Sequence, residues 1–320
     1  MIKLFASLRT LAARAAVSAL AVAVLASGCV MLETKERELI WRPVRTAASW
    51  YGGLPAQVQD LYLPVRVGAD SPKIHAWWWP AEDRRAPAVL YLHGARWNLT
   101  GQLRRIEQLR QFGFSVFAID YRGFGQSDGD LPSESTVYED AGAAWAWLAQ
   151  RQPDASRRFI YGHSLGGAVA VDLAAALSAK GASAGGLIVE SSFTSLADVA
   201  AEMSYRWLPL RFILSEKFDS VKKMAQVAMP VLIVHGANDT YVPSRLSAAL
   251  YAAAPAPKKL LLIEGGGHNN SMWLGNVQYR AAIAELFGLQ TTGDQLAGET
   301  VTGATSHAGV AKAGRRGTRG

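Results

Sequence analysis

One serine of the chain stands in a pattern that is typical of a nucleophile. Residues 162–166 read Gly-His-Ser-Leu-Gly, after a short buried-strand sequence at 158–161 and before an alanine-rich helical sequence at 167–180. A G-x-S-x-G between a strand and a helix forms a sharp, strained turn that lifts the serine hydroxyl clear of the sheet. Gly162 and Gly166 fit this turn because a Cβ at either position would collide as the strand and the helix close together. The pattern predicts Ser164 as a nucleophile.

A serine hydroxyl is a weak nucleophile unless a base removes its proton during attack. Asp239 and His268 each follow a predicted strand, so both are expected in loops at the carboxyl ends of neighbouring parallel strands, where catalytic groups gather. His268 is suited to act as the base near neutral pH, and Asp239 would fix its tautomer and stabilise the imidazolium. Glu190, after the preceding strand, is the alternative acid.

The oxyanion that forms during acyl transfer needs two backbone donors. One is predicted to be the N–H of Leu165, directly after the nucleophile. The other is predicted to be the N–H of Ala95, in the loop after an apolar strand at 87–92, because Gly94 lets the backbone turn inward there.

These pieces resemble the α/β-hydrolase superfamily, in its serine-aminopeptidase or monoglyceride-lipase-like branch, and most of all the membrane-associated "HGN"-type hydrolases that include depalmitoylating enzymes. The resemblance covers about residues 60 to 288 and implies a serine hydrolase. One departure is Ala95-Arg96-Trp97, where relatives often carry Asn and small residues, so the pocket wall is expected to differ while the backbone donor remains. The matching motifs are His93-Gly94, the run from Asp120 to Gly129, the Ser164 turn, Glu190 to Ser195, Phe218 to Ser220, the Asp239 segment and His268.

The order of apolar segments predicts one α/β domain over residues 56–290, with a mostly parallel eight-stranded sheet and helices on both faces, because strands alternate with helices after the first two. A segment at about 196–229 interrupts this alternation, and Tyr205 to Leu214 within it resembles a short cap over the active site. The predicted strands are 60–66, 73–79, 87–92, 114–119, 157–161, 185–190, 230–235 and 258–263, and the predicted helices are 103–112, 137–150, 167–180, 244–253 and 279–287.

The amino terminus predicts export and membrane attachment. Basic residues precede an apolar run at 15–26 and then Ser27-Gly28-Cys29, which is typical of a secretory signal and resembles a bacterial lipobox. Cys29 is the only cysteine, which excludes an intramolecular disulfide and favours lipidation. Residues 1–28 are therefore predicted as a lipoprotein signal peptide and 29–55 as a linker. The alternative is an uncleaved anchor over 15–32, a length at the lower limit for spanning a bilayer.

Charge and composition restrict the partners. Of the net charge of +7, the first 28 residues contribute +3 and residues 291–320 contribute +2, so the remaining domain carries only +2 and no nucleic-acid partner is indicated. The tail at 291–320 is rich in Gly, Ala and Thr and is predicted to be disordered. No spacing indicates a metal site, and neither an organic cofactor nor an obligate protein partner is expected.

Taken together, the residues predict a cofactor-independent serine hydrolase of the bacterial cell envelope, which cleaves a small-molecule or lipid acyl ester or thioester through an acyl-enzyme on Ser164. A peptidase, an amidase or an acyltransferase would use the same triad. The alternative from another class is a catalytically silent binding lipoprotein, against which the complete set of Ser, Asp and His argues.

Overall fold

The fold is built on one sheet of eight strands, with the order β1-β2-β4-β3-β5-β6-β7-β8. We analysed a computed structural model, which describes residues 27–28, 30–205 and 207–289. The strands are β1 (Gln59–Pro64), β2 (Lys73–Trp79), β3 (Ala88–Leu92), β4 (Ser115–Ile119), β5 (Arg158–His163), β6 (Gly186–Glu190), β7 (Val231–Gly236) and β8 (Lys258–Ile263). Cys29, the predicted tail and all but the last two residues of the predicted signal peptide lie outside the described residues.

The sheet is mostly parallel. β1 pairs antiparallel with β2, β2 pairs antiparallel with β4, and every other neighbouring pair is parallel. All residues of β3, β4, β6 and β7 are buried, as expected for strands covered on both faces. The predicted eight-stranded, mostly parallel α/β sheet is confirmed.

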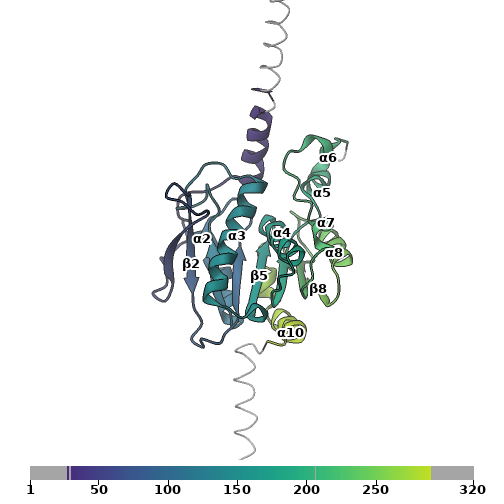
Figure 1. Ribbon diagram of the computed structural model, residues 1–320. Coiled ribbons are helices and arrows are strands. Elements are labelled where there is room, and N and C mark those ends of the chain that lie inside the picture. Colours follow the sequence, from purple (N-terminus) through teal and green to yellow (C-terminus); the bar gives the residue numbers. More distant parts are fainter. Residues whose placement is uncertain (1–26, 29, 206, 290–320) are drawn as a thin grey trace, which may run out of the picture.

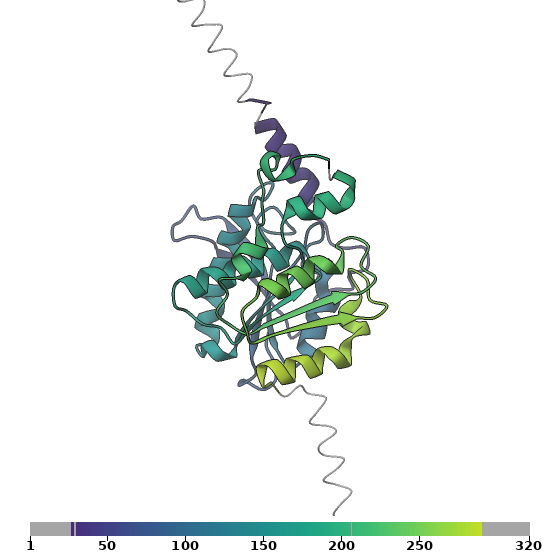
Figure 2. The ribbon, with the colours of Figure 1, turned by 90° about the vertical axis from the view of Figure 1, so that its right-hand side faces the viewer.

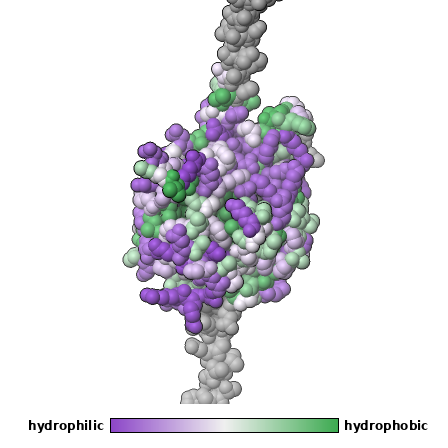
Figure 3. Space-filling view, viewed as in Figure 1, coloured by the Kyte–Doolittle hydropathy of each residue, from purple (hydrophilic) through white to green (hydrophobic). Residues whose placement is uncertain are grey.

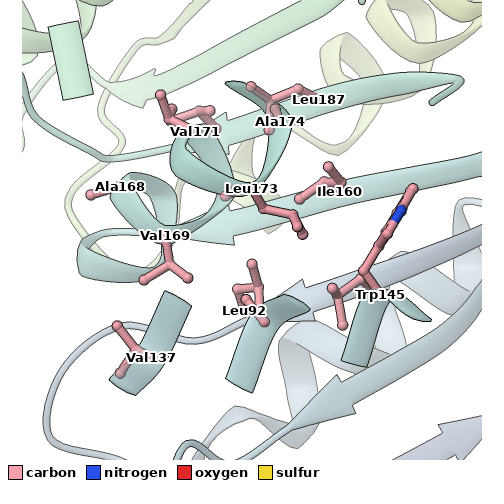
Figure 4. Packing of buried hydrophobic residues seen from close by; sticks show 14 of the residues in the cluster. Leu92, Val137, Trp145, Ile160, Ala168, Val169, Val171, Leu173, Ala174 and Leu187 are labelled. Atoms are coloured by element: carbon pink, nitrogen blue, oxygen red, sulfur yellow. The ribbon is translucent and has the colours of Figure 1, made fainter. Parts of the chain in front are cut away.

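Helices cover both faces of this sheet (Figures 1 and 2). α3 (Glu134–Arg151), α4 (Leu165–Ala179) and α8 (Ser244–Ala253) share one apolar cluster with the sheet. α2 (Leu99–Gln111), α9 (Ser271–Leu274) and α10 (Asn276–Phe287) share the cluster on the opposite face. In Figure 4, Val169 and Leu173 of α4 pack with Trp145 of α3 and with Leu92 and Ile160 of the central strands.

Several helices begin earlier than the apolar periodicity predicted, and in two of them polar caps set the start. The side chain of Asn98 accepts a hydrogen bond from the Thr100 N–H and starts α2 at Leu99, four residues before the predicted start. Ser133 and Thr136 form a capping box that starts α3 at Glu134.

The segment 29–55, predicted as a linker, contains a helix over residues 30–41 that packs onto the domain. Trp41 at its end is fully buried and makes edge contacts with the rings of Tyr121, Phe124 and Phe218, at centroid distances of 6.2, 6.1 and 5.8 Å. The backbone continues this attachment, since the Arg96 N–H donates to the Trp41 carbonyl at 2.8 Å. The start of the chain after Cys29 is therefore joined rigidly to the domain.

The segment predicted as a cap consists of short helical turns, the first of which lie at the same end of the molecule as helix 30–41 (Figure 1). They are α5 (Leu196–Ala200), a π-helical turn (Ala201–Tyr205), α6 (Leu210–Ile213) and α7 (Ser220–Met224). Two of its aromatic side chains are not packed inward: Trp207 is 79% exposed and Phe212 is 89% exposed, whereas Phe218 is fully buried. Buried apolar side chains, among them Phe218 and Met224, fasten the second half of the segment to the core, and ion pairs such as Arg211–Asp198 and Arg245–Glu202 add polar contacts.

Candidate active site

The backbone at Ser164 has the strained conformation that the sequence predicts. Ser164 has φ 55° and ψ −122° and joins β5 directly to α4. A Cβ on Gly162 would lie 2.2 Å from the Gly166 carbonyl oxygen, and one on Gly166 would lie 2.2 Å from the Leu92 carbonyl oxygen. Only glycine fits at either position, so the side chain of Ser164 is held at the carboxyl edge of the sheet.

The structure brings Ser164, His268 and Asp239 into one hydrogen-bonded row. His268 Nε2 lies 3.0 Å from Ser164 Oγ, and His268 Nδ1 lies 2.8 Å from Asp239 Oδ2. An ionised carboxylate can only accept, so the ring proton sits on Nδ1 and Nε2 is free to accept the hydroxyl proton of Ser164. This is the tautomer that a general base requires.

Asp239 is held as a carboxylate by four donors. Its Oδ1 accepts from the N–H groups of Tyr241 and Val242, both at 2.9 Å, and its Oδ2 lies 3.1 Å from His235 Nε2 as well as close to His268. Burial alone would raise the pKa of Asp239, but the hydrogen bonds from His235 and His268 hold it well below its usual range. Asp239 therefore remains charged at neutral pH and can stabilise an imidazolium at His268.

The two predicted oxyanion donors belong to segments next to the nucleophile. Leu165 is the first residue of α4, so its N–H has no partner within the helix. The loop that carries Ala95 passes close to the nucleophile, because a Cβ on Gly94 would lie 3.1 Å from Ser164 Cβ. Among the loop and turn hydrogen bonds of the described residues, neither N–H is used as a donor. Both are therefore available to a bound oxygen.

Glu190, the alternative acid, is engaged elsewhere. Its carboxylate is fully buried and accepts hydrogen bonds from four side chains, none of them His268. These donors are Arg105 (2.6 Å), Tyr161 (2.5 Å), Tyr279 (2.7 Å) and Ser271 (2.9 Å). Burial would raise the pKa of Glu190, but the Arg105 guanidinium lowers it, so the pair stays ionised inside the protein.

This buried network also holds the loop that carries His268. His163 Nε2 donates to the His268 carbonyl oxygen at 2.9 Å, and Arg105 Nη2 donates to the Asn269 carbonyl oxygen at 3.3 Å. Ser271, two residues further on, donates to Glu190. Burial lowers the pKa of His163 well below its usual value, so His163 is neutral and acts as a fixed donor. The sequence did not predict this network, because its members come from different elements and share no local pattern.

Removing the tie between Ser271 and Glu190 is expected to impair catalysis by misplacing His268. Ser271→Ala should lower kcat about 10-fold with little change in KM, since a small misplacement of the base weakens proton transfer. Tyr279→Phe is the matched control, because it removes another donor to the same carboxylate from α10, outside the histidine loop. Both variants should lose about 1–3 kcal/mol of unfolding free energy. Equal kcat values in the two variants would contradict this role of the tie.

Three further features concern possible ligands and the membrane: a pocket, clusters of metal-binding residues and membrane-spanning helices. A pocket of about 230 Å³ within the cap segment is lined mainly by charged side chains, including Arg211, Glu216 and Lys217, and contains none of the triad residues. Within the described ranges, no cluster of three or more His, Cys, Asp or Glu residues is suited to a metal ion. The helices described between residues 27 and 289 include none with the length and apolar character needed to span a bilayer.

Known proteins are similar to this chain in sequence and in fold. Residues 83–218 match the family model described as serine aminopeptidase, S33. Rv2307c of Mycobacterium tuberculosis is 37% identical over 256 residues, which cover 78% of this chain and 86% of that protein. YfhR of Escherichia coli K12 is 30% identical over 225 residues, covering 68% and 76%. Both are called uncharacterized proteins.

Two further similar proteins have names that state an activity. The lysophosphatidylserine lipase ABHD12 of Danio rerio is 34% identical over 198 residues, covering 58% of this chain and 51% of that protein. The structure of the Pyrococcus furiosus esterase Pf2001 superposes with a TM-score of 0.58 at 20% identity, covering 77% of this chain and 98% of the esterase, and thus shares the fold. The chain therefore belongs to the serine aminopeptidase S33 family of the α/β-hydrolase superfamily and is a serine hydrolase.

Proposed function

We propose that the protein cleaves carboxylic esters or thioesters with an apolar acyl chain, through an acyl-enzyme on Ser164, at a bacterial cell envelope. The observation that carries the chemistry is the row Ser164–His268–Asp239, with distances of 3.0 and 2.8 Å, flanked by two unused backbone donors. An ester substrate is supported by the names of the lipase relative and of the esterase with the same fold, and a thioester would be cleaved by the same residues.

The geometry supports a two-step reaction. His268 Nε2 takes the proton of Ser164 while Oγ attacks the acyl carbon, and the N–H groups of Ala95 and Leu165 hold the oxyanion. The imidazolium, stabilised by Asp239, then protonates the leaving alcohol or thiol. Water enters and gives a proton to His268 while its oxygen attacks the acyl carbon. The bond between Ser164 Oγ and the acyl carbon then breaks, and His268 returns the proton to Oγ as the acid leaves. An alcohol that replaces water in this second step would make the enzyme an acyltransferase.

An acyl adduct on Ser164 is the direct test of this proposal. Rapid quenching with acid during turnover of a p-nitrophenyl ester should give a peptide containing Ser164 with the mass of the acyl group added. The kcat/KM should rise with acyl length and exceed that for aminoacyl amides, because an apolar chain gains contact energy and an amine is a poorer leaving group. Faster cleavage of aminoacyl amides than of esters would assign the protein to peptide chemistry instead.

Cys29 is proposed to carry the membrane anchor. Wild-type protein from a bacterial host should lack residues 1–28 and carry two or more acyl chains on Cys29, since a single chain binds a membrane only marginally. Cys29→Ser should accumulate as a precursor that retains residues 1–28. The measurement is the intact mass of both proteins. A mature wild-type protein that still begins at Met1 would support the uncleaved anchor and exclude lipidation-linked processing.

A further inference from the structure

Two segments far apart in the sequence expose apolar side chains at the same end of the molecule. The cap exposes Met203, Trp207 and Phe212 to 58%, 79% and 89%, and the start of helix 30–41 exposes Val30, Met31 and Leu32 to 62%, 66% and 59%. We call these six residues the end patch. In Figure 3, hydrophobic colouring marks both the cap and the start of this helix. Scattered single apolar residues are common on surfaces, but a shared apolar end usually marks an interaction site.

Direct contacts join the two segments into one surface. The backbone N–H and the hydroxyl of Ser215 donate to Glu36 Oε2 at 2.8 and 2.9 Å, and the Glu216 N–H donates to Glu36 Oε1 at 2.8 Å. Glu36 lies in the middle of helix 30–41, so the end of the cap is fastened beside that helix. Figures 1 and 2, turned by 90° from each other, both place the cap next to helix 30–41.

The adjoining chain argues for an apolar environment at this end. In the precursor, residues 15–26 contain no charged side chain and are followed by the described residues 27–28 and, after Cys29, by Val30. In the mature protein proposed above, the acyl chains on Cys29 would stand next to Val30 in the sequence, so both forms place an apolar group directly before the end patch.

The charged residues next to the end patch are of both signs, so they do not favour a partner that carries mainly positive or mainly negative charge. Helix 30–41 carries Glu33, Lys35, Glu36, Arg37 and Glu38, and two of these, Lys35 and Glu38, pair with each other at 2.6 Å. A surface with mixed charges around exposed Trp, Phe and aliphatic side chains matches the boundary between lipid headgroups and acyl chains, where aromatic residues are enriched.

We infer that the end patch docks on a lipid bilayer, with its apolar side chains at the boundary between headgroups and acyl chains. The cap then faces the membrane, and substrates dissolved in that membrane meet this end of the enzyme first. The inference rests on the membrane attachment proposed above and does not depend on hydrolysis. Because apolar contact and not charge provides the attraction, docking should persist at high salt.

Spin labels test this orientation. In a Cys29→Ser background, which has no other cysteine, Phe212→Cys or Ser183→Cys each accepts one nitroxide. Ser183 is the matched control, since it is also exposed but precedes β6, at the opposite end of the sheet from the site. The full chain, residues 1–28 included, is reconstituted into vesicles of phosphatidylethanolamine and phosphatidylglycerol, and collision of each label with oxygen and with a water-soluble relaxation agent is measured.

The expected result is a label at 212 that collides more with oxygen and at least 5-fold less with the aqueous agent than the label at 183, in low and in high salt. Equal aqueous access at the two positions, or failure of the protein to float with the vesicles, would overturn docking. Spectral broadening at 212 that disappears on dilution with unlabelled protein would show that a second copy covers the patch, which also overturns it. Turnover is not measured, so a failure of the proposed hydrolysis would leave these outcomes unchanged.

Discussion

Ser164→Ala is expected to abolish labelling by a fluorophosphonate probe and to lower kcat on the order of 10⁵-fold, with the fold intact. The expectation follows from the half-buried hydroxyl at φ 55°, whose only role in the described hydrogen bonds is its contact with His268. His268→Ala should lower kcat nearly as much, and the double variant hardly more, because nucleophile and base act as one unit.

The measurement is probe labelling and ester kinetics, with thermal unfolding as the control for the fold. Ser192→Ala is a suitable matched variant, since Ser192 lies close by and donates to the Ser164 carbonyl oxygen without touching His268. Its labelling should persist. Full turnover in Ser164→Ala would exclude the acyl-enzyme.

The second prediction with a large expected effect distinguishes the role of Asp239 from that of Glu190. Asp239→Asn should lower kcat about 10³–10⁴-fold. The asparagine can still accept from the Tyr241 and Val242 N–H groups, but its amide N–H₂ would then face His268 Nδ1. The ring would have to accept there and carry its proton on Nε2, where it can no longer take the proton of Ser164. The unfolding free energy should change much less than the rate.

Glu190→Gln should instead lower the unfolding free energy strongly and kcat only mildly. It leaves the buried Arg105 guanidinium without its counter-charge, which costs about 3–5 kcal/mol of unfolding free energy. For the molecules that remain folded, kcat should fall at least 10-fold less than in Asp239→Asn, because Glu190 does not contact His268. Ester kinetics below the unfolding temperature, combined with denaturant titration, give both quantities. A severe loss of kcat in folded Glu190→Gln with a mild one in Asp239→Asn would reassign the acid.

The sheet was predictable from the sequence because its central strands are continuous apolar runs. β7, for example, lies within one residue of its predicted bounds, and all its residues are buried. Ser164, Asp239 and His268 were predictable for a related reason: each follows such a strand, and parallel strands bring their carboxyl ends to one edge. For these strands and residues, the local sequence pattern and the overall topology predict the same arrangement.

What the sequence did not predict depends on tertiary packing. Arg105 looks like a surface residue of an amphipathic helix, yet it is buried because Glu190, from a strand 85 residues later, neutralises it. His235 shows no pattern beyond a strand end, and only the fold places it beside Asp239. Helix 30–41 falls in the segment 29–55 that was predicted as a linker, and the burial of its Trp41 depends on rings more than 75 residues away.

The rigid attachment of helix 30–41 restricts where the enzyme can work. A flexible linker over 29–55 would give the domain a root-mean-square reach of about 30 Å and free rotation above an anchor at Cys29. The helix instead spans about 18 Å, and its far end is fixed by the burial of Trp41. With the anchor proposed at Cys29, such a domain would keep one orientation relative to its membrane and would meet substrate by diffusion in two dimensions. It would act on the leaflet that holds its anchor and not on an opposing membrane.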